Sequence, residues 1–569
     1  MARLTRHYAH WPAGVPQTLE VADRNLFSHL ARSAEAAPDK VAISYYGRST
    51  SYRSLHADAL ALAGYLQQRL GVRRGDRVML LMQNCPQFVI AYYAVLRCDA
   101  VVVAMNAMST AEEVAYYASD SGARVLIATQ DMMDRAQSLL DDNRLDGCVV
   151  GAVSEFAGPP EAVPFLEIPG FVREARRPLA GPGLHTFSGA LAAGIAPTPM
   201  QGGGGDLAVV AYTSGTTGKP KGAMLTHRNF AHASLQRVAW LSEQADQSEL
   251  LVLPASHLAG MNVMNLAIYV GRTVVLLSRW DGDAVVELIE RLRLYAWCAV
   301  TPMLAEVFSR PDIAQRDLSS LRRLYGGATA MPEALIRKIE ERLGLSFIES
   351  YGLTEACGAS HINPTQAARR QCAGVPHINC DARVIDPDSG AELGPAHPGE
   401  IVIHSPTLFE GYWNQPEATA AATIEIDGKR FLRSGDIGHH DEDGYFYVTD
   451  RLKRMINAAG LKIWPAEIET SLYGHPAVQE ACVISAFDAR RGETVKAFVV
   501  LRPAARGTLA PEAVTEWART RLSAYKVPRL VEFVEALPKT ATGKILWREM
   551  QAQQDANDEA ARAAALALT

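Results

Sequence analysis

The chain has 569 residues, of which 48% are hydrophobic and 21% are charged, and its formal net charge at pH 7 is −6. A chain of this length is too long for a single hydrophobic core, so we expect two or more folded units. The slightly acidic balance argues against bulk binding of nucleic acid, which favours a basic surface.

Strand-like and helix-like patterns alternate along most of the chain. The first series predicts strands over 77–82, 101–104 and 124–128 and helices over 86–97 and 112–119. The second series predicts strands over 273–277, 298–301, 321–325 and 346–350 and helices over 284–295 and 332–343. Alternation of this kind indicates an α/β fold with mainly parallel sheets.

Two segments are predicted to be connections between folded parts. Residues 181–206 are rich in Gly, Pro and Ala, which is typical of a surface connection. A second boundary is expected near 450–454, and the chain beyond it has a mixed α+β pattern and ends in an Ala-rich tail over 551–569, which is expected to be helical. These features predict an N-terminal domain over 1–452 and a small C-terminal domain over 453–569.

The eight cysteines include no CxxC pair, which indicates reduced, mostly buried thiols in a cytoplasmic protein. The first eleven residues have no apolar core, so we expect no signal peptide. The longest apolar stretch, 258–277, is interrupted by polar residues and glycine. It predicts a buried helix and strand and not a transmembrane helix, although peripheral contact with a membrane stays open.

The most informative segment follows a predicted strand over 207–211 and spans 212–222. Hydroxyls, glycines and lysines crowd this segment, and together they suit a polyphosphate. The residues concerned are Thr213, Ser214, Gly215, Thr216, Thr217, Gly218, Lys219 and Lys221. It is not the P-loop of NTPases, because Gly215 and Gly218 are too close together and Pro220 follows Lys219.

Five further motifs follow, at 326–332, 351–356, 434–438, 450–456 and 538–545. With the segment above, they resemble the motifs of the adenylate-forming enzymes, in the same order. That family comprises acyl-CoA synthetases, luciferases and the adenylation domains of peptide synthetases, and the resemblance covers nearly the whole chain. It implies a large N-terminal domain, a small mobile C-terminal domain, and the use of ATP and Mg²⁺. For an acyl-CoA synthetase it also implies coenzyme A as co-substrate.

The resemblance assigns roles around the nucleotide. It implies that Thr354 contacts the α-phosphate, that Glu355 together with Thr213 holds Mg²⁺, and that Tyr351 stacks on adenine. Oxygen ligands of this kind suit Mg²⁺. The same reasoning places Gly327, Ala328 and Gly352 in the ATP site.

Two residues near the end of the predicted N-terminal domain are assigned to the ribose. By resemblance, Asp436 accepts hydrogen bonds from the ribose hydroxyls, and Arg451 binds the same ribose or the phosphate. A carboxylate can bind a diol through both of its oxygens.

The C-terminal domain is implied to carry the catalytic lysine, Lys544. A cation between the attacking carboxylate and the α-phosphate lowers the repulsion of two anions. The resemblance makes Lys453 the hinge, next to Arg454, where the family often has an acidic residue. It assigns Gly460, Lys462 and Trp464 to the tunnel for coenzyme A.

The resemblance also implies an acyl pocket, whose residues are mostly small or apolar: His257, Met261, Thr301, Pro302 and Gly326. No Asp stands at position 257, where amino-acid-activating relatives tend to carry one. We therefore expect ATP-dependent synthesis of an acyl-CoA from a medium- to long-chain fatty acid. The alternatives are an aryl acid or a short or branched acid, or an adenylating enzyme that does not use coenzyme A. A homodimer is a further open alternative.

Overall fold

The computed structural model describes residues 5–213, 220–327, 331–458, 461–488, 491–539 and 545–566. The chain forms two compact units. The first consists of Met1–Ala382, Ile403–Arg433 and Asp443–Tyr445, and the second of Arg383–Val402, Ser434–Glu442 and Phe446–Thr569. These units differ from a division at residue 452, because 383–402 and 434–442 pack with the C-terminal part. The boundary of the moving domain therefore stays a prediction.

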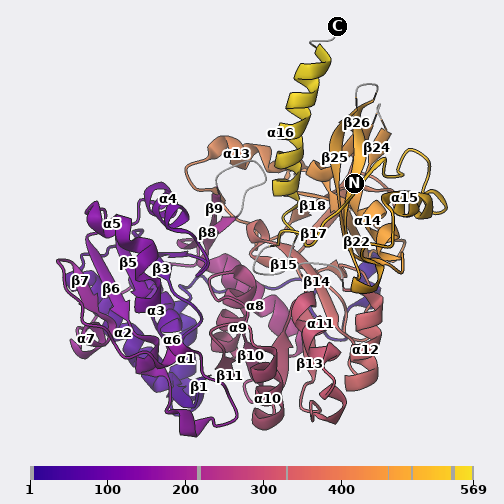
Figure 1. Ribbon diagram of the computed structural model, residues 1–569. Coiled ribbons are helices and arrows are strands. Elements are labelled where there is room, and N and C mark those ends of the chain that lie inside the picture. Colours follow the sequence, from indigo (N-terminus) through magenta and orange to yellow (C-terminus); the bar gives the residue numbers. More distant parts are fainter. Residues whose placement is uncertain are drawn as a thin grey trace. The chain divides into compact units, whose positions relative to one another are not determined.

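The first unit is built on two large sheets (Figure 1). The nine-stranded sheet has the order β16 (Val375–Pro376), β15 (Gly358–Ile362), β14 (Ile348–Leu353), β13 (Arg323–Gly326), β12 (Ala296–Cys298), β10 (Ser248–Leu251), β11 (Thr273–Leu276), β1 (Val41–Tyr45) and β2 (Arg48–Ser51). The eight-stranded sheet has the order β19 (Gly411–Tyr412), β9 (Lys221–Thr226), β8 (Leu207–Thr213), β4 (Val101–Ala104), β3 (Arg77–Leu81), β5 (Val125–Thr129), β6 (Gly147–Gly151) and β7 (Leu184–Thr186). The central strands of both sheets are parallel, which confirms the predicted α/β class.

Helices of the first unit lie between and beside the two sheets. They are α1 (Phe27–Ala36), α2 (Tyr52–Arg69), α3 (Pro86–Arg97), α4 (Ala111–Ser121), α5 (Gln137–Asp141), α6 (Gly170–Arg173), α7 (Phe187–Ala192), α8 (His227–Leu241), α9 (Leu258–Val270), α10 (Gly282–Leu292), α11 (Thr301–Ser309), α12 (Glu333–Leu343) and α13 (Pro416–Ala421). Helix α2 contacts β1 and β2 while α3 contacts β3 and β4, and the two helices also contact each other. A helical layer therefore separates the sheets.

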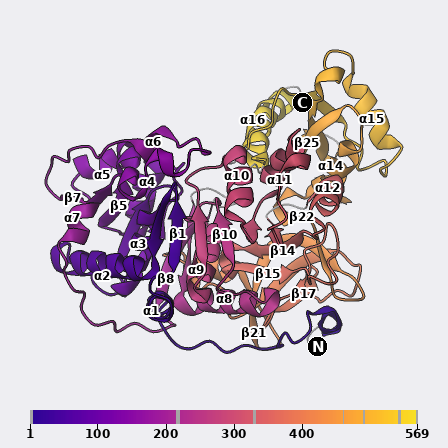
Figure 2. The ribbon, with the colours of Figure 1, turned by 90° about the horizontal axis from the view of Figure 1, so that it is seen from below.

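The outer face of the eight-stranded sheet is covered by α4 and α5 (Figure 2). Met79 and Val103 of the sheet share a buried cluster with Val114 of α4 and Leu139 of α5. Helix α4 begins with a capping box, in which Thr110 and Glu113 satisfy each other's backbone N–H groups. This fixed start orients α4, whose later residues support the predicted phosphate-binding segment.

Most of the predicted elements are present. Helix α3 and strand β4 have the predicted bounds, and 258–277 forms α9 and β11. The strand predicted over 298–301 is wrong, because β12 ends at Cys298 and Thr301 begins helix α11, where Pro302 occupies the first turn. The connection predicted over 181–206 is wrong in part, because it contains β7 and α7.

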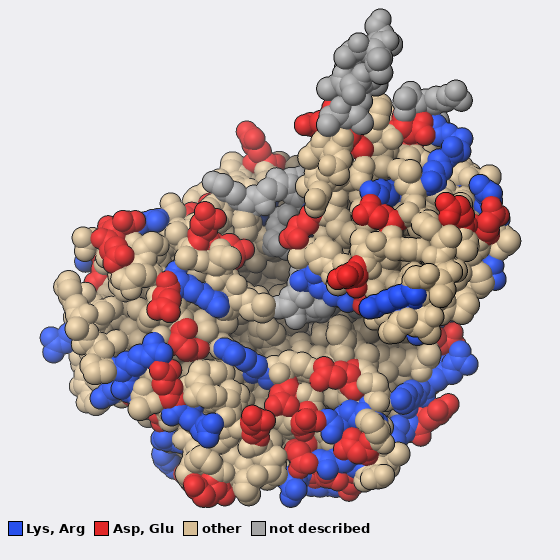
Figure 3. Space-filling view, in the orientation of Figure 1, with Lys and Arg blue, Asp and Glu red and all other residues tan. Residues whose placement is uncertain are grey.

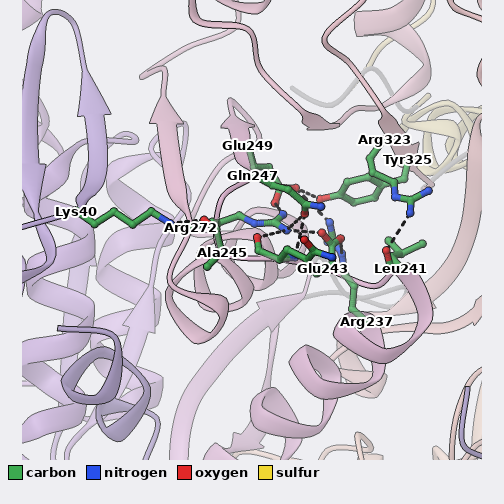
Figure 4. Close-up of polar contacts among 11 residues, drawn as sticks. Lys40, Arg237, Leu241, Glu243, Ala245, Gln247, Glu249, Arg272, Arg323 and Tyr325 are labelled. Atoms are coloured by element: carbon green, nitrogen blue, oxygen red, sulfur yellow. Dashed lines mark hydrogen bonds and ion pairs between the residues drawn. The ribbon is translucent and has the colours of Figure 1, made fainter. Parts of the chain in front are cut away.

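A buried charge cluster joins residues in and beside the strands of the nine-stranded sheet (Figure 4). The guanidinium of Arg272 donates to Glu249 at 2.8 Å and also pairs with Glu243, and all three side chains are fully buried. Arg237 pairs with Glu249 at 3.2 Å, and the Tyr325 hydroxyl donates to the same carboxylate. Burial alone raises the pKa of Glu249, but Arg237 and Arg272 hold that pKa below its ordinary value.

The second unit contains an antiparallel sheet with one parallel edge strand. Its order is β24 (Leu461–Ile463), β23 (Ile456–Ala458), β26 (Gly492–Leu501) and β25 (Val478–Asp488), and β27 (Leu530–Phe533) pairs with β26. Its helices are α14 (Pro465–Tyr473), α15 (Pro511–Arg519) and α16 (Trp547–Leu566). This content confirms the predicted α+β pattern.

Helix α16 includes most of the Ala-rich tail and packs along β25. Polar side chains dock it: Asp558 accepts a hydrogen bond from Phe487 N at 2.7 Å, and Gln554 accepts one from the Lys496 ammonium at 2.8 Å. The predicted helix at this end of the chain is therefore confirmed, and it is part of the second unit's fold.

Another sheet has the order β17 (Asp381–Ile385), β18 (Gly399–His404), β21 (Lys429–His440) and β20 (Thr423–Ile426), with β22 (Phe446–Arg451) paired to β21. Strand β21 belongs to both units, because the division falls between Arg433 and Ser434.

No helix within the described part of the chain is both long and apolar enough to cross a membrane. On the face shown in Figure 3, basic and acidic side chains are interspersed.

Candidate active site

Three neighbouring strands place candidate residues at one edge of the nine-stranded sheet. Strands β12, β13 and β14 are parallel, so their carboxyl ends lie together. Thr301 and Pro302 begin α11 directly after β12, Gly326 ends β13, and Tyr351 lies near the end of β14. The structure therefore places three of the predicted acyl-pocket residues, Thr301, Pro302 and Gly326, at the same sheet edge as Tyr351.

Glycines at this edge allow neighbouring stretches of backbone to pack very closely. A Cβ added at Gly326 would lie 1.9 Å from the carbonyl oxygen of Ala299, and one added at Gly327 would lie 2.1 Å from that of Ser350. At Gly352 it would lie 1.8 Å from the carbonyl oxygen of Gly358. Neighbouring backbone therefore leaves no room for a Cβ at any of these three positions.

Thr354 and Glu355 follow β14 in a short 3₁₀ turn, η6 (Thr354–Ala356). The turn ends at Cys357, whose positive φ of 50° redirects the chain into β15. In β14 the Tyr351 ring lies 5.5 Å from the ring of His361. Thr354 and Glu355 are both half-buried, so their polar atoms are held by the fold but keep some access to solvent.

The predicted phosphate-binding segment is framed by an antiparallel pair of strands. Thr213 ends β8 and Lys221 begins β9, and the two residues face each other in the ladder. Helix α4 contacts both ends of the segment: the Tyr212 hydroxyl donates to Asp120 at 2.6 Å, and the Tyr116 hydroxyl donates to Pro220 O at 2.8 Å. These contacts fix where the segment begins and ends.

Strand β9 also lies against the turn η6 that carries Glu355. The Tyr412 hydroxyl donates to Glu355 Oε1 at 2.7 Å, and Phe409 N donates to Glu355 O at 2.8 Å. Burial, followed by the nearby Glu355, raises the pKa of Tyr412, so the phenol keeps its proton at neutral pH. Thr213, Lys221 and Glu355 thus belong to one connected part of the first unit.

The remaining acyl-pocket candidates lie at the start of α9. His257 is the N-cap of this helix, and its Nδ1 accepts a hydrogen bond from Ala259 N at 3.2 Å. Part of its surface is exposed, yet desolvation lowers its pKa, so the imidazole is neutral at pH 7. Met261 is fully buried, and the next residue, Asn262, donates to Cys357 O at 2.9 Å.

Several predicted residues belong to the second unit. Asp436 is buried and pairs with Arg451, whose Nε lies 2.5 Å from Asp436 Oδ1. Lys453 lies in the 3₁₀ turn η7 (Leu452–Arg454), and Trp464 is the N-cap residue of α14. Lys462 lies in β24. An Asp436 carboxylate already held by an arginine is oriented for further hydrogen bonds.

Other predicted residues lie outside the described part of the chain. They are Ser214, Gly215, Thr216, Thr217, Gly218, Lys219, Ala328, Gly460 and Lys544. Their roles stay predictions.

The described residues contain no cluster of three or more His, Cys, Asp or Glu side chains that could hold a metal alone. A single carboxylate fits Mg²⁺ when phosphate and water oxygens complete the coordination. Glu355 is such a carboxylate, since Tyr412 donates to only one of its oxygens. The residues present therefore fit an ion that arrives with ATP.

The contacts of Tyr412, Tyr116 and Asp120 are the main features that the sequence did not indicate. Tyr412 reaches Glu355 across 57 positions of sequence, and Tyr116 reaches Pro220 across 104. The only signal in the sequence is that both tyrosines lie in polar–aromatic stretches, which is too common to identify a partner.

Comparison with known proteins identifies the family. Residues 30–413 match the sequence profile described as AMP-binding enzyme, and residues 467–544 match the profile of the AMP-binding enzyme C-terminal domain. The chain belongs to the AMP-binding enzyme family. Within that family it is an AMP-forming acid–CoA ligase.

Two curated relatives of this AMP-binding enzyme are similar along nearly their whole length. The long-chain-fatty-acid–CoA ligase of Bacillus subtilis (strain 168) is 34% identical over 563 residues, covering 96% of this chain and 98% of the relative. The feruloyl-CoA synthase of an Amycolatopsis species is 35% identical over 532 residues, covering 93% and 99%. Among solved structures, ATP-bound MatB from Rhodopseudomonas palustris superposes with a TM-score of 0.81 at 26% identity, covering 93% of this chain and 99% of that one.

Proposed function

We propose that this enzyme activates a medium- to long-chain fatty acid with ATP and transfers the acyl group to coenzyme A. One observation carries the proposal. Glu355, in the turn after β14, lies beside β9, the strand that leaves the predicted phosphate-binding segment. The carboxylate that we propose as the metal ligand therefore lies next to the strand that follows the predicted phosphate-binding segment, and it follows the carboxyl end of β14, where α/β proteins bind ligands.

The reaction has two steps. In the first, a carboxylate oxygen of the acid attacks the α-phosphorus of ATP, the bond to the β-phosphate oxygen breaks, and acyl-AMP and pyrophosphate form. In the second, the coenzyme A thiol loses its proton and attacks the acyl carbon, and AMP leaves. Thr354 is proposed to contact the α-phosphate, and Lys221 to attract the phosphate chain.

Mg²⁺ bound by Glu355 and Thr213 would neutralise charge on the phosphates when ATP is present. The protein's part is to position the phosphates, which the anchoring of both ends of the 212–222 segment by α4 supports. Tyr351 and Gly352 are proposed to line the adenine site, and Asp436 and Arg451 to bind the ribose.

Lys544 is proposed to bridge the acid and the α-phosphate in the first step only, with the domain over 453–569 rotating about Lys453 between steps. Lys544→Ala is expected to abolish acid-dependent ATP–pyrophosphate exchange while sparing thioester formation from supplied acyl-AMP. Lys539→Ala is the matched control, because the ammonium of this lysine, five positions earlier in the sequence, forms a surface pair with Glu480 at 2.6 Å. Equal loss of both steps in Lys544→Ala would contradict the assignment.

An uncharged acyl tail is supported by the candidate pocket. His257, Met261, Thr301, Pro302 and Gly326 carry no charge at neutral pH, since the pKa of His257 is lowered. The test measures AMP release with coenzyme A for acids from acetate to palmitate, plus benzoate and a cinnamate. We expect the highest kcat/KM for a medium or long fatty acid.

An aryl acid is the second candidate, and the similarity to a feruloyl-CoA synthase favours it. A flat ring needs a short, wide pocket, whereas an alkyl chain needs a long, narrow one. The same panel separates the two, because a cinnamate preferred over every fatty acid would overturn the first candidate and leave the two-step reaction intact.

A further inference from the structure

Tyr412 connects two parts of the candidate active site. It lies in β19, which pairs with β9 so that Tyr412 faces Ala223, two residues after Lys221. Its hydroxyl reaches the Glu355 carboxylate at 2.7 Å. The strand leaving the phosphate-binding segment and the proposed metal ligand are therefore joined through one side chain.

The ring of Tyr412 is held on several sides. Phe409 packs against it in an edge-to-face arrangement with 4.9 Å between ring centroids, and the Lys221 ammonium lies 5.1 Å from its centroid. The backbone N–H of Tyr412 donates to Thr419 Oγ1 at 2.8 Å. A ring fixed in this way presents its hydroxyl at a defined position, at little further cost in conformational entropy.

A carboxylate that binds a metal needs a defined orientation. Hydrogen bonds from neighbouring groups commonly supply it, and their loss weakens metal binding. The backbone of Glu355 is fixed by the bond from Phe409 N, and its carboxylate is oriented by the phenol.

We propose that Tyr412 is a positioning residue, which orients Glu355 so that the enzyme binds Mg²⁺ together with ATP. This inference rests on the proposed function. It goes further in naming the residue that couples the position of Lys221 and its strand to that of the metal ligand. The inference also assigns different roles to two parts of Tyr412. The ring packs against Phe409 and Lys221, and the hydroxyl contacts Glu355.

The test uses Tyr412→Phe, which keeps the ring and removes the hydroxyl. ATP binding to the full chain is measured by calorimetry with excess EDTA and then with excess Mg²⁺. The ratio of the two dissociation constants reports how strongly Mg²⁺ promotes ATP binding. We expect Tyr412→Phe to lower this ratio by about tenfold to a hundredfold, as for a lost hydrogen bond to a charged group that binds a metal, with ATP binding in EDTA unchanged.

Tyr65→Phe is the matched control, because it also removes a single phenolic hydrogen bond, to His185 at 2.9 Å on α2 and β7. It is expected to leave the ratio unchanged. Equal ratios in Tyr412→Phe and Tyr65→Phe would overturn the inference. Equal weakening of ATP binding with and without Mg²⁺ in Tyr412→Phe would also overturn it, because it would indicate a general structural role of the hydroxyl.

A double-mutant cycle gives a second measurement. If Tyr412 acts through Glu355, removal of its hydroxyl has no further effect on the ratio in Glu355→Gln. Additive effects would contradict the proposal. Failure of the proposed function is distinguishable, because it would appear as absent ATP binding and absent acid-dependent exchange in the unchanged protein.

Discussion

The guanidinium of Arg454 forms a two-pronged ion pair with the carboxylate of Glu469 on α14. Arg454 Nη1 lies 3.2 Å from Glu469 Oε2, and Nη2 contacts Oε1 and donates to Val483 O at 3.1 Å. Both side chains are largely buried, and the guanidinium also lies 5.5 Å from the ring of Trp547. Arg454 follows the predicted hinge, so this pair fixes the end of the hinge turn to the second unit.

The first prediction concerns this pair. An acidic residue at position 454, which is frequent in the family, would here lie next to the carboxylates of Glu469 and Asp450. Arg454→Glu is expected to lower the free energy of unfolding of the second unit by about 3–5 kcal/mol, because it leaves buried like charges. The charge exchange Arg454→Glu with Glu469→Arg is expected to recover roughly half of that loss in urea unfolding. A double variant no more stable than Arg454→Glu would contradict this.

The second prediction concerns Gly352. An added methyl group at this position meets the carbonyl oxygen of Gly358 at 1.8 Å, so strands β14 and β15 must separate. Because Tyr351 and Thr354 are carried by the same strand and turn, Gly352→Ala is expected to reduce ATP–pyrophosphate exchange by about 100-fold. Gly170→Ala is the control, since nothing lies within 4 Å of its added Cβ. Comparable activity in the two variants would show that the strands accommodate the methyl group.

The third prediction concerns Glu349, a buried residue of β14. Burial raises the pKa of Glu349 from 4.5 to about 7. A carboxyl group whose pKa is raised by folding keeps its proton in the native state after the unfolded chain has lost it. The contribution of Glu349 to the free energy of unfolding is therefore favourable at low pH. It decreases by roughly 3 kcal/mol as the pH rises from about 4.5 to about 7.

Glu349→Gln removes this titration. Compared with the unchanged protein, the glutamine variant is expected to gain stability progressively between about pH 4.5 and about pH 7, as measured by urea unfolding of the first unit. Parallel pH profiles for the two proteins would show that Glu349 does not titrate in this range.

The fourth prediction concerns the buried charge cluster. Arg272→Met leaves Glu249 and Glu243 without their main partner, and we expect a loss of about 3–5 kcal/mol in the free energy of unfolding. Arg293→Met is the control, because the side chains of Arg293 and its partner Asp317 are each 54% exposed and such pairs contribute less than about 1 kcal/mol. Similar effects of the two variants in urea unfolding would show that the cluster is not a net stabiliser.

The sequence pattern alone predicted those helices and strands whose local preferences agree with the way the segment packs in the fold. Helix α3 was predicted with its full bounds because Pro86 marks its first turn and its apolar face is continuous. The segment 298–301 was misassigned because its β-branched residues favour a strand, while the position of Pro302 and the end of β12 start a helix. Which segments pair in a sheet depends on packing beyond the local pattern.

The candidate site shows the same limit. Motif residues such as Glu355 and Tyr351 were predicted because their types and order resemble a family. The supporting contacts of Tyr412 and of Arg454 with Glu469 were not predicted, because each joins residues distant in sequence through side-chain geometry. The steric need for Gly326, Gly327 and Gly352 was not predicted either, since only the packed strands show that backbone occupies the space of a Cβ.

All eight cysteines are buried, and burial raises the pKa of four of them, Cys85, Cys148, Cys298 and Cys482, to about 12. Thiols that are both protonated and enclosed react slowly with maleimides. The chain is therefore suited to site-specific labelling without prior removal of its own cysteines. One cysteine at exposed Glu161 and another at exposed Glu512 would place a fluorophore on each unit, so that energy transfer during a single turnover could test the proposed domain motion.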